Sequence, residues 1–390
     1  MNTIDSVPEL AGLRRAALVG GAIGIVATLA GAVLDPTQFF RSYLMAWLYW
    51  AGLALGCLGL LMVYHLTAGG WGVAIRRLLE AAIATLPAMA LLFVPLLFGL
   101  GALYAWTDTR AVMADRVLSQ KAAYLNVPFF VARAAAYFFV WLTLAHFLDR
   151  WSRQQDDPAD PRPADRLRKL SGGGLVAYAL AMTFAAFDWI MSLEPHWFST
   201  IFGMIFIADA AVGAMAFVLV VSFLLARGGA FGRVLAPSIL NDLGNLLLAF
   251  VMVYAYVSFS QVLIIWSANL PEEIPWYLHR IEGGWNLIAI GLAVFYFAVP
   301  FLVLLARGNK RQPQRLAAIA AGVLAARLLS VFFQVGPEFY THGLSAHWLD
   351  FAALAGLGGT WISLFARRLS RRPLLAHGDP ELASALARPH

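Results

Sequence analysis

Charged residues are scarce in this sequence of 390 residues: Asp, Glu, Lys and Arg make up 13%, against roughly 25% in soluble domains. Hydrophobic residues make up 61%. Cysteine is limited to Cys57, which excludes an internal disulfide framework, a Cys-x-x-Cys-His haem attachment site and an iron–sulfur cluster held by this chain's own cysteines. The composition therefore indicates a membrane protein that crosses the bilayer several times, and redox centres of those kinds would belong to partners.

The basic residues stand in short segments between apolar runs, without a Gly-rich phosphate loop or an RNA-binding aromatic signature. The net charge of +6 therefore does not indicate a nucleic-acid partner. Most of these basic segments fall on one side of the predicted membrane, so the positive-inside rule places both termini in the cytoplasm. The segments are those at Arg14–Arg15, Arg76–Arg77, Arg150–Lys169, Arg227–Arg233, Arg307–Arg315 and Arg367–Arg372.

Ten apolar runs are long enough to cross a bilayer, which needs about 20 residues for each helix. We therefore predict an all-α fold, with 1–390 as a single integral-membrane domain. The charged, Pro-rich segment 150–170 is predicted to be a mobile cytoplasmic linker, and 368–390 a cytoplasmic tail. The first run could be mistaken for a signal peptide, but we expect it to be an uncleaved span. The runs are 13–34, 42–67, 77–104, 126–149, 172–193, 199–226, 238–267, 283–306, 315–335 and 347–367.

Ionisable residues inside the predicted spans are the main candidates for function, because a charge in hydrocarbon costs about 2.5–3.5 kcal/mol even on the mildest scales. One group is predicted near the outer ends of the helices and a second near the inner ends, with Asp209 at about the midplane. We expect Arg133 and Arg327 to face carboxylates. The outer group is Arg133, Asp188, Glu194 and His196 and could include Arg327, and the inner group is His65, Glu80, His146 and Asp242.

These groups suggest a path for protons. Asp242 and Asp209 would accept protons from the inner side, and Asp188, Glu194 and His196 would pass them outward, with Arg133 adjusting the proton affinities. The competing interpretation of Asp188 and Asp209 is that each forms an ion pair with an arginine that fixes helix packing. No catalytic residue and no metal site is predicted.

Several candidates have simpler interpretations. Glu80 follows Arg76 and Arg77 at helical spacing and is expected to pair with them. His65 and His146 could be the axial ligands of a haem or belong to the proton path, but histidines at helix ends are the default. Asp242 could instead complement a helix dipole. Trp189 beside Asp188 is a weak candidate for a quinone site, because interfacial aromatic residues are common.

Three segments resemble one known family. They are the turn Asp188–Thr200 (DWIMSLEPHWFST), the helix opening Asn241–Asn245 (NDLGN) and the loop Trp266–Tyr277 (WSANLPEEIPWY). Together with the ten-span layout, they resemble the NrfD-like family of polysulfide-reductase membrane subunits, and within it the smaller of the two such subunits of bacterial alternative complex III. The resemblance covers nearly the whole chain.

The resemblance implies two four-helix bundles plus flanking helices in a quinol:electron-acceptor oxidoreductase of a respiratory or photosynthetic chain. The subunit would carry no redox centre, offer proton half-channels and anchor periplasmic subunits. The implied partners are a larger NrfD-like membrane subunit, an iron–sulfur/molybdopterin-like subunit, c-type cytochromes that carry the haems, a terminal oxidase and bound membrane lipids, with quinol as substrate of the complex.

Three other functions stay open. The chain could bind quinone directly, or it could be a purely structural anchor whose polar groups hold helices together. Ten spans would also permit a stand-alone secondary transporter. Against a transporter, the sequence shows no paired interruptions by Gly or Pro in matching halves.

Overall fold

The computed structural model describes residues 8–156, 162–226, 229–376, 379 and 381–382, whose regular elements are all helices. Among these residues, ten helical stretches are long and apolar enough to cross a membrane, which confirms the prediction of an all-α polytopic membrane protein. The first five are α1 (Pro8–Leu34), α2 (Pro36–Thr67), α3–α6 (starting with α3, Gly70–Ile83), α9 (Val127–Gln155) and α10 (Arg162–Trp189). The other five are α11 (Phe202–Leu225), α13 (Pro237–Ala268), α15–η3–α16 (starting with α15, Trp285–Gly291), α18 (Pro313–Phe339) and α19 (Trp348–Leu369).

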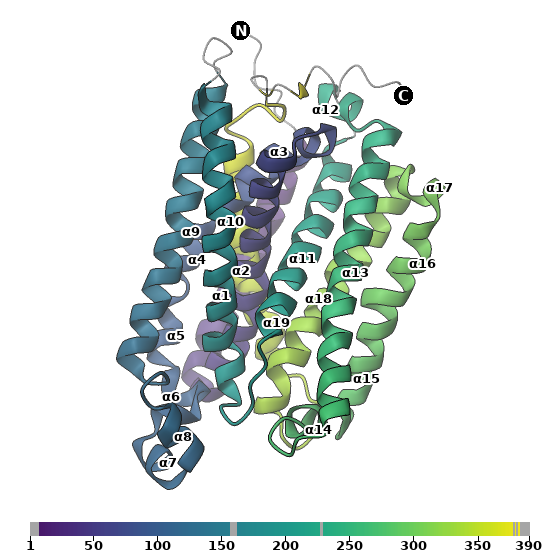
Figure 1. Cartoon of the computed structure of the whole chain (residues 1–390). Helices are drawn as coiled ribbons and strands as arrows, with labels where there is room; N and C mark the ends of the chain where they lie inside the picture. The colour runs from purple at the N-terminus through teal and green to yellow at the C-terminus, as the bar shows by residue number, and fades with distance from the viewer. Residues whose placement is uncertain (1–7, 157–161, 227–228, 377–378, 380, 383–390) are drawn as a thin grey trace.

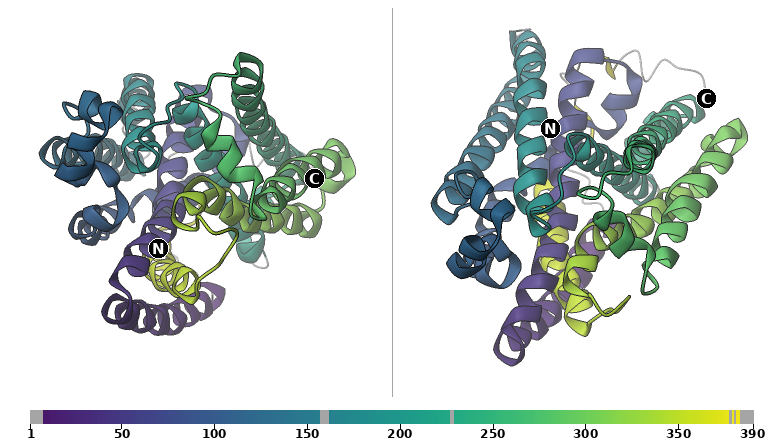
Figure 2. Two further views of the ribbon diagram at one scale, coloured as in Figure 1. Left: turned by 90° about the horizontal axis from the view of Figure 1, so that it is seen from below. Right: turned by 60° about the horizontal axis from the view of Figure 1, so that its bottom comes forward.

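The spans form two four-helix bundles with two flanking helices. In the first bundle α2, α3–α6, α9 and α10 pack together, and in the second α11, α13, α15–η3–α16 and α18 do so. The bundles meet where α2 and α10 pack on α11, while α1 and α19 pack on each other and on α2. Figure 1 shows α9 and α10 on one side of the molecule and α13 and α16 on the other, and the view from below in Figure 2 agrees.

Glycines allow α1 to lie directly on α19. A Cβ atom on Gly24 would be 2.4 Å from the backbone nitrogen of Gly356, and one on Gly21 would be 2.8 Å from the Cα of Gly359. Such small residues let the backbones of membrane helices approach closely, which compensates for the missing hydrophobic drive between helices in lipid. The remaining faces of α1 are largely exposed, as expected of a flanking helix that contacts lipid.

Two of the spans begin with a proline in the first turn and a side-chain N-cap. The α2 helix begins at Pro36 rather than at residue 42, because the Asp35 carboxylate accepts the backbone N–H of Gln38 at 3.0 Å. The α9 helix begins in the same way, with Asn126 accepting the backbone N–H of Phe129 at 3.0 Å. The Asp35 cap lies outside the predicted run 42–67, so hydropathy alone places the start of α2 too late, whereas the predicted start of the fourth span at 126 agrees with α9 to within one residue.

The third span is interrupted. After α3, the chain forms the short helices α4 (Leu86–Leu91), α5 (Val94–Phe98) and α6 (Leu100–Leu103). Side chains of α2 bind carbonyl groups at the breaks: Trp47 Nε1 donates to the Met89 oxygen at 2.9 Å, and the Tyr43 hydroxyl donates to the Leu92 oxygen at 2.8 Å. Irregular backbone at this depth is stable where protein groups satisfy it, as they do here.

The eighth span contains η3 (Leu292–Ala298), a π-helical segment between α15 and α16 (Val299–Leu305). Pro300 has no N–H to give to the carbonyl of Tyr296 four residues earlier, which favours a departure from α-helical bonding. The interrupted spans are the second helix of the first bundle and the third helix of the second bundle, so they do not hold matching places, and the expectation of no paired interruptions stays a prediction. Tyr296 lies within this π-helical segment, and its hydroxyl reaches Asp209 of α11.

The segment predicted as a mobile linker, 150–170, is helical over most of its length. The α9 helix continues to Gln155 and α10 begins at Arg162, while 157–161 lie outside the described residues. Local ion pairs such as Lys169 with Asp165 support the helical ends of this charged segment. The predicted tail 368–390 also differs: α19 continues to Leu369 and the chain then packs on α3, while 377–378, 380 and 383–390 lie outside the described residues.

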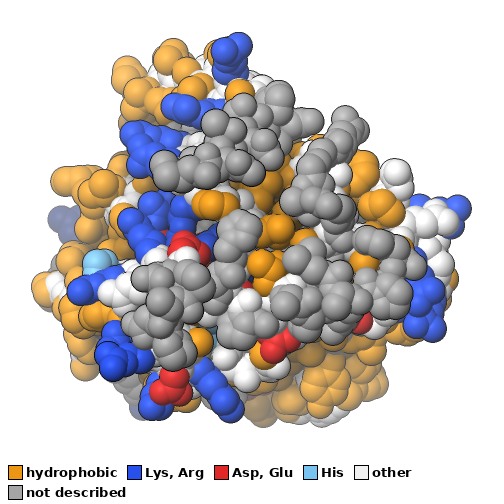
Figure 3. Space-filling model, turned by 90° about the horizontal axis from the view of Figure 1, so that it is seen from above, with side chains coloured by type: hydrophobic (Ala, Val, Ile, Leu, Met, Phe, Trp, Pro, Cys, Tyr) orange, Lys and Arg blue, Asp and Glu red, His pale blue; other side chains and the backbone are white. Residues whose placement is uncertain are grey.

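The first helix begins and the last helix ends at the same end of the bundle (Figure 1). We call this the basic end, because it carries Arg76, Arg77, Arg367, Arg368 and Arg372. Figure 3 looks onto it and shows Lys and Arg side chains in several groups. The opposite, far end carries α7 (Thr109–Ala114), α8 (Arg116–Lys121) and α14 (Pro275–Ile281). The charge distribution fits the predicted cytoplasmic termini, which stay a prediction.

Candidate functional site

Asp209 forms a buried ion pair in the second bundle. Its Oδ2 accepts Nε of Arg327 at 2.9 Å, and its Oδ1 accepts the hydroxyl of Tyr296 at 2.9 Å. Asp209 is 1% exposed and Arg327 0% exposed. Asp209 lies seven residues after Phe202, the start of α11, which corresponds to about 10 Å from the far end of that helix. It therefore lies somewhat closer to the far end than the midplane position that the sequence predicts.

The neighbouring helices are shaped to hold the Arg327 guanidinium. Its Nη1 donates to the Tyr49 carbonyl of α2 at 2.9 Å, so the side chain connects the two bundles. A Cβ atom on Gly52 would be 2.3 Å from Nη2 of Arg327, and one on Gly213 would be 2.4 Å from its Cδ. These two glycines leave the space that the arginine occupies.

A polar stripe continues from Arg327 along α18 toward the far end. It consists of Arg327, Ser330, Gln334 and Glu338, whose spacing of three or four residues places them on one face of the helix. The Ser330 hydroxyl is hydrogen-bonded to the Tyr254 hydroxyl at 3.0 Å and accepts Nε2 of Gln334 at 3.2 Å. Hydroxyl and amide groups can both donate and accept hydrogen bonds, and this stripe places such groups between Arg327 and the far end of the helix.

The stripe ends at Arg280 and Glu194. Arg280 of α14 donates through Nη2 to the Gln334 carbonyl at 2.9 Å and through Nη1 to Oε1 of Glu194 at 2.7 Å. Burial lowers the pKa of the Arg280 guanidinium, and the adjacent Glu194 acts in the opposite direction. Glu338 is near enough to both groups to interact with them electrostatically. The Glu194 side chain is 11% exposed, so this group of charges lies close to the surface.

The turn between α10 and α11 is bound on both sides by far-end elements. On one side, the rings of Trp197 and Trp276 stack with centroids 4.6 Å apart, which ties the turn to α14. On the other, Lys121 of α8 donates to the Pro195 carbonyl at 2.6 Å. The turn therefore joins the α7–α8 loop to α14 in one far-end surface.

His196 of this turn contacts the α7–α8 loop. Its Nε2 lies 2.6 Å from Oδ2 of Asp115, the residue that caps α8. The hydrogen bond from His196, together with the backbone N–H groups of α8, lowers the pKa of the Asp115 carboxyl. The His196 side chain is 59% exposed. It is an exposed contact between loops and does not touch Asp188 or Asp209 in the described contacts.

Asp188 forms a second buried ion pair, in the first bundle. The two carboxylate oxygens accept Nε and Nη2 of Arg133 at 2.8 and 2.9 Å, and Oδ2 also accepts the Tyr137 hydroxyl at 2.6 Å. The bidentate pair joins α9 to α10 and leaves Asp188 with no exposed surface. Arginine–carboxylate pairing is therefore confirmed for both Arg133 and Arg327. The structure places the two pairs in different bundles rather than in one continuous path.

Trp189, the weak quinone candidate, is enclosed by protein. It is 1% exposed, and its ring contacts five aromatic rings, with Phe138 stacked at 5.9 Å. A quinone ring could not stack on Trp189 without displacing these neighbours. The other four rings are those of Trp47, Phe93, Tyr137 and Trp141.

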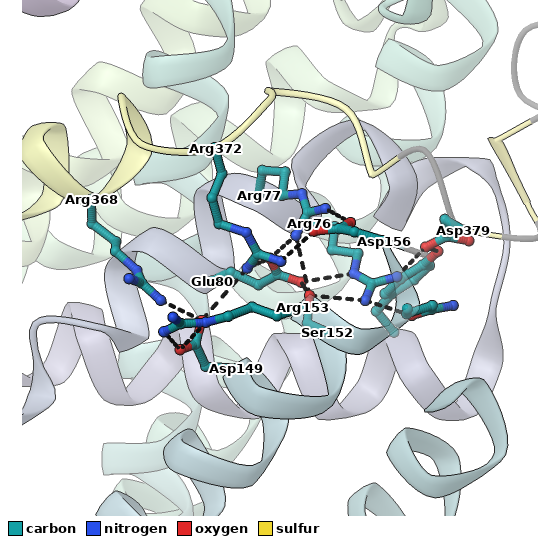
Figure 4. Close-up of polar contacts among 12 residues, drawn as sticks. Arg76, Arg77, Glu80, Asp149, Ser152, Arg153, Asp156, Arg368, Arg372 and Asp379 are labelled. Atoms are coloured by element: carbon teal, nitrogen blue, oxygen red, sulfur yellow. Dashed lines mark hydrogen bonds and ion pairs between the residues drawn. The ribbon is translucent and has the colours of Figure 1, made fainter. Parts of the chain in front are cut away.

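A cluster of charges at the basic end holds Glu80 (Figure 4). Oε1 of Glu80 accepts Nε of Arg76 at 2.8 Å, and Oε2 accepts Nη1 of Arg77 at 2.6 Å, so the expected local ion pair is confirmed. Arg372, beyond α19, donates to the same carboxylate at 3.1 Å, and Arg76 reaches Asp379 at 2.5 Å. Ser152 also donates to Oε1 of Glu80, so four side chains hold this buried carboxylate, which indicates a fixed structural cluster.

The two histidines among the inner candidates lie on different sides of this cluster. His65, at the end of α2, is partly buried, lines a cavity with Arg76 and Asp379 and interacts electrostatically with Glu80. His146 of α9 is exposed and lines a separate cavity, so the two histidines do not face each other across one pocket. Asp242 lies near the start of α13 and is partly exposed. Within the described residues, no group of three His, Cys, Asp or Glu is placed to hold a metal ion.

Sequence reasoning missed Tyr296, Arg280 and Glu338. Glu338 had a detectable signal, since it stands eleven residues after Arg327, which is three helical turns. Arg280 had no such signal in the sequence, because it lies in a predicted loop. Tyr296 had none either, because it lies in the π-helical segment, which was not predicted from the sequence.

The comparisons with known proteins add no relative. No family model matches the sequence, and no curated protein matches it.

Proposed function

We propose that this chain is a membrane subunit of a multi-subunit quinol:electron-acceptor oxidoreductase, related to the NrfD-like subunit of alternative complex III. In this proposal the chain holds no redox centre, anchors redox subunits at its far end and provides a proton half-channel. The iron–sulfur clusters and c-type haems belong to the partners. The observation that carries the proposal is the buried polar stripe from Asp209 to Glu194, because ionisable residues inside a membrane most often serve ion or proton movement.

The half-channel runs between Asp209 and the far end. The hydroxyls of Tyr254 and Ser330 and the amide of Gln334 lie between the buried acid and the charges of Arg280 and Glu194. Protonation of Asp209 would require its pair with Arg327 to loosen, so transfer is tied to a change at that pair. Connection to the basic end needs water or a conformational step.

The far-end surface is the proposed contact for partners. The turn that includes Glu194 and Trp197 is bound to α14 and to the α7–α8 loop, which gives an ordered platform at the end of both bundles. Under the predicted orientation this platform faces the periplasm, where the iron–sulfur and cytochrome subunits would dock.

The test measures protons moved per electron in vesicles that contain the purified complex, with a short-chain quinol as donor. Asp209→Asn and Gln334→Leu should both lower the ratio while quinol oxidation continues. The matched control is Asp188→Asn, an equally buried acid paired with an arginine in the other bundle, which should leave the ratio unchanged.

Two outcomes would replace parts of the proposal. An unchanged ratio in Asp209→Asn and Gln334→Leu would leave the chain as a structural anchor whose ion pairs fix helix packing. Purification of the chain without redox partners would remove the proposed complex itself.

A further inference from the structure

A cavity of about 790 Å³ opens at the basic end between α3–α4, α9 and α19. Its deeper wall is apolar and includes Pro87, Phe139, Leu142 and Leu364. Its outer wall is charged. This part is lined by His146, Asp149, Arg153, Arg367, Arg368 and Arg371.

The change from apolar to basic follows the helix axes. On α9 the lining residues run from Phe139 through His146 to Arg153, a rise of about 21 Å at 1.5 Å per residue. On α19 Leu364 precedes Arg367 in the same direction. The cavity therefore has an apolar part at the depth of acyl chains and a basic part at the helix ends, where lipid headgroups lie.

The basic part has more positive charge than the protein neutralises. Asp149 is its only acid among the lining residues, and it already accepts Nη2 of Arg368 at 2.5 Å and Nε of Arg153 at 3.1 Å. Within the described part of the chain, no ion pair involves Arg367 or Arg371, and both are exposed (Figure 4 shows the paired neighbours). An anion in the cavity would balance their charge.

We propose that this cavity binds an anionic phospholipid. The phosphate group would contact Arg367 and Arg371, whose guanidinium groups suit phosphate oxygens, and an acyl chain would lie along Phe139 and Leu142. A soluble phosphate would use only the basic part and leave the apolar wall uncovered. Phe139 is 72% exposed, so the apolar wall is open toward the bilayer. The site does not depend on the proposed redox function.

The test titrates the purified full-length chain in neutral detergent with phosphatidylglycerol and, separately, with phosphatidylethanolamine, and counts bound lipid by native mass spectrometry. Wild type should bind one phosphatidylglycerol in preference to phosphatidylethanolamine. In R367Q/R371Q the Kd for phosphatidylglycerol should rise about 30-fold, since each basic residue near a membrane surface contributes about 1 kcal/mol. The matched control R307Q/R311Q removes the same charge from exposed arginines outside the cavity and should leave the Kd unchanged.

A second arm separates lipid from free phosphate. Inorganic phosphate at 100-fold excess over the lipid should not displace phosphatidylglycerol. The variant L142W, which fills the apolar part of the cavity, should weaken the binding of phosphatidylglycerol. Equal affinity in wild type and R367Q/R371Q would overturn the proposal. Displacement by inorganic phosphate, with no effect of L142W, would show a soluble-anion site instead.

Discussion

The ion pair of Asp209 and Arg327 allows a direct measurement of how much a buried charge pair stabilises this fold. Removing one partner leaves a buried charge without compensation, which costs about 3–5 kcal/mol. Arg327→Met would leave the Asp209 carboxylate with the Tyr296 hydroxyl as its remaining described side-chain partner. Asp209→Leu would leave the guanidinium with carbonyl groups only. Each single variant should therefore lose about 3–5 kcal/mol of unfolding free energy.

The double variant Asp209→Leu/Arg327→Met should behave differently. It removes both charges together and fills the space with apolar atoms, and such replacements are often neutral or stabilising by about 1–4 kcal/mol. Tyr296→Phe sets the scale for one hydrogen bond, with an expected loss of about 1 kcal/mol. The costs of the two single variants should not add.

The assay is reversible unfolding in mixed micelles by increasing mole fraction of sodium dodecyl sulfate, followed by tryptophan fluorescence. A loss in Arg327→Met no larger than that in Tyr296→Phe would refute the reasoning, because it would mean that Asp209 is not charged or that water reaches it. The double variant could be as stable as wild type and yet move no protons in the complex. That result would show that Asp209 and Arg327 are needed for proton transfer and not for the stability of the fold.

Two further predictions concern the flanking helix and the far end. Gly24→Leu should lower the unfolding free energy in the same assay by about 1–3 kcal/mol, because the Cβ of the leucine would overlap the backbone of Gly356 and weaken the packing of α1 on α19. Gly20→Leu is the control and should have no effect, because Gly20 faces open space. The pKa of the Asp115 carboxyl is lowered in the folded protein, so the carboxylate that caps α8 is fully ionised above the ordinary pKa of an aspartate. The cap is lost only as the pH falls through the lower pKa of the folded state. In His196→Ala this loss should begin at higher pH, measured as hydrogen exchange of the α8 amides corrected for intrinsic rates; identical pH profiles would contradict the contact.

The number and order of the spans could be predicted from sequence because hydropathy over about 20 residues depends only on local composition. The pairing of Arg133 and Arg327 with carboxylates followed from the cost of an isolated buried charge. The choice of acid did not follow, since Asp209 and Arg327 are 118 residues apart and their contact depends on helix packing. The linker prediction failed for a related reason: Pro and charge near 157–161 hid the helical ends on both sides.

Asp188 and Asp209 show why residue type and depth are insufficient to assign a role. Both are buried acids near the far end, and both pair with an arginine and accept a tyrosine hydroxyl. Their surroundings differ. Asp188 adjoins the Tyr137 hydroxyl and the aromatic rings around Trp189, whereas Asp209 adjoins the hydroxyl and amide groups that follow Arg327 along α18. A buried acid–arginine pair can therefore join two helices in one bundle and, under the proposed function, stand at the end of a proton route in the other, and the neighbours beyond the pair distinguish the two cases.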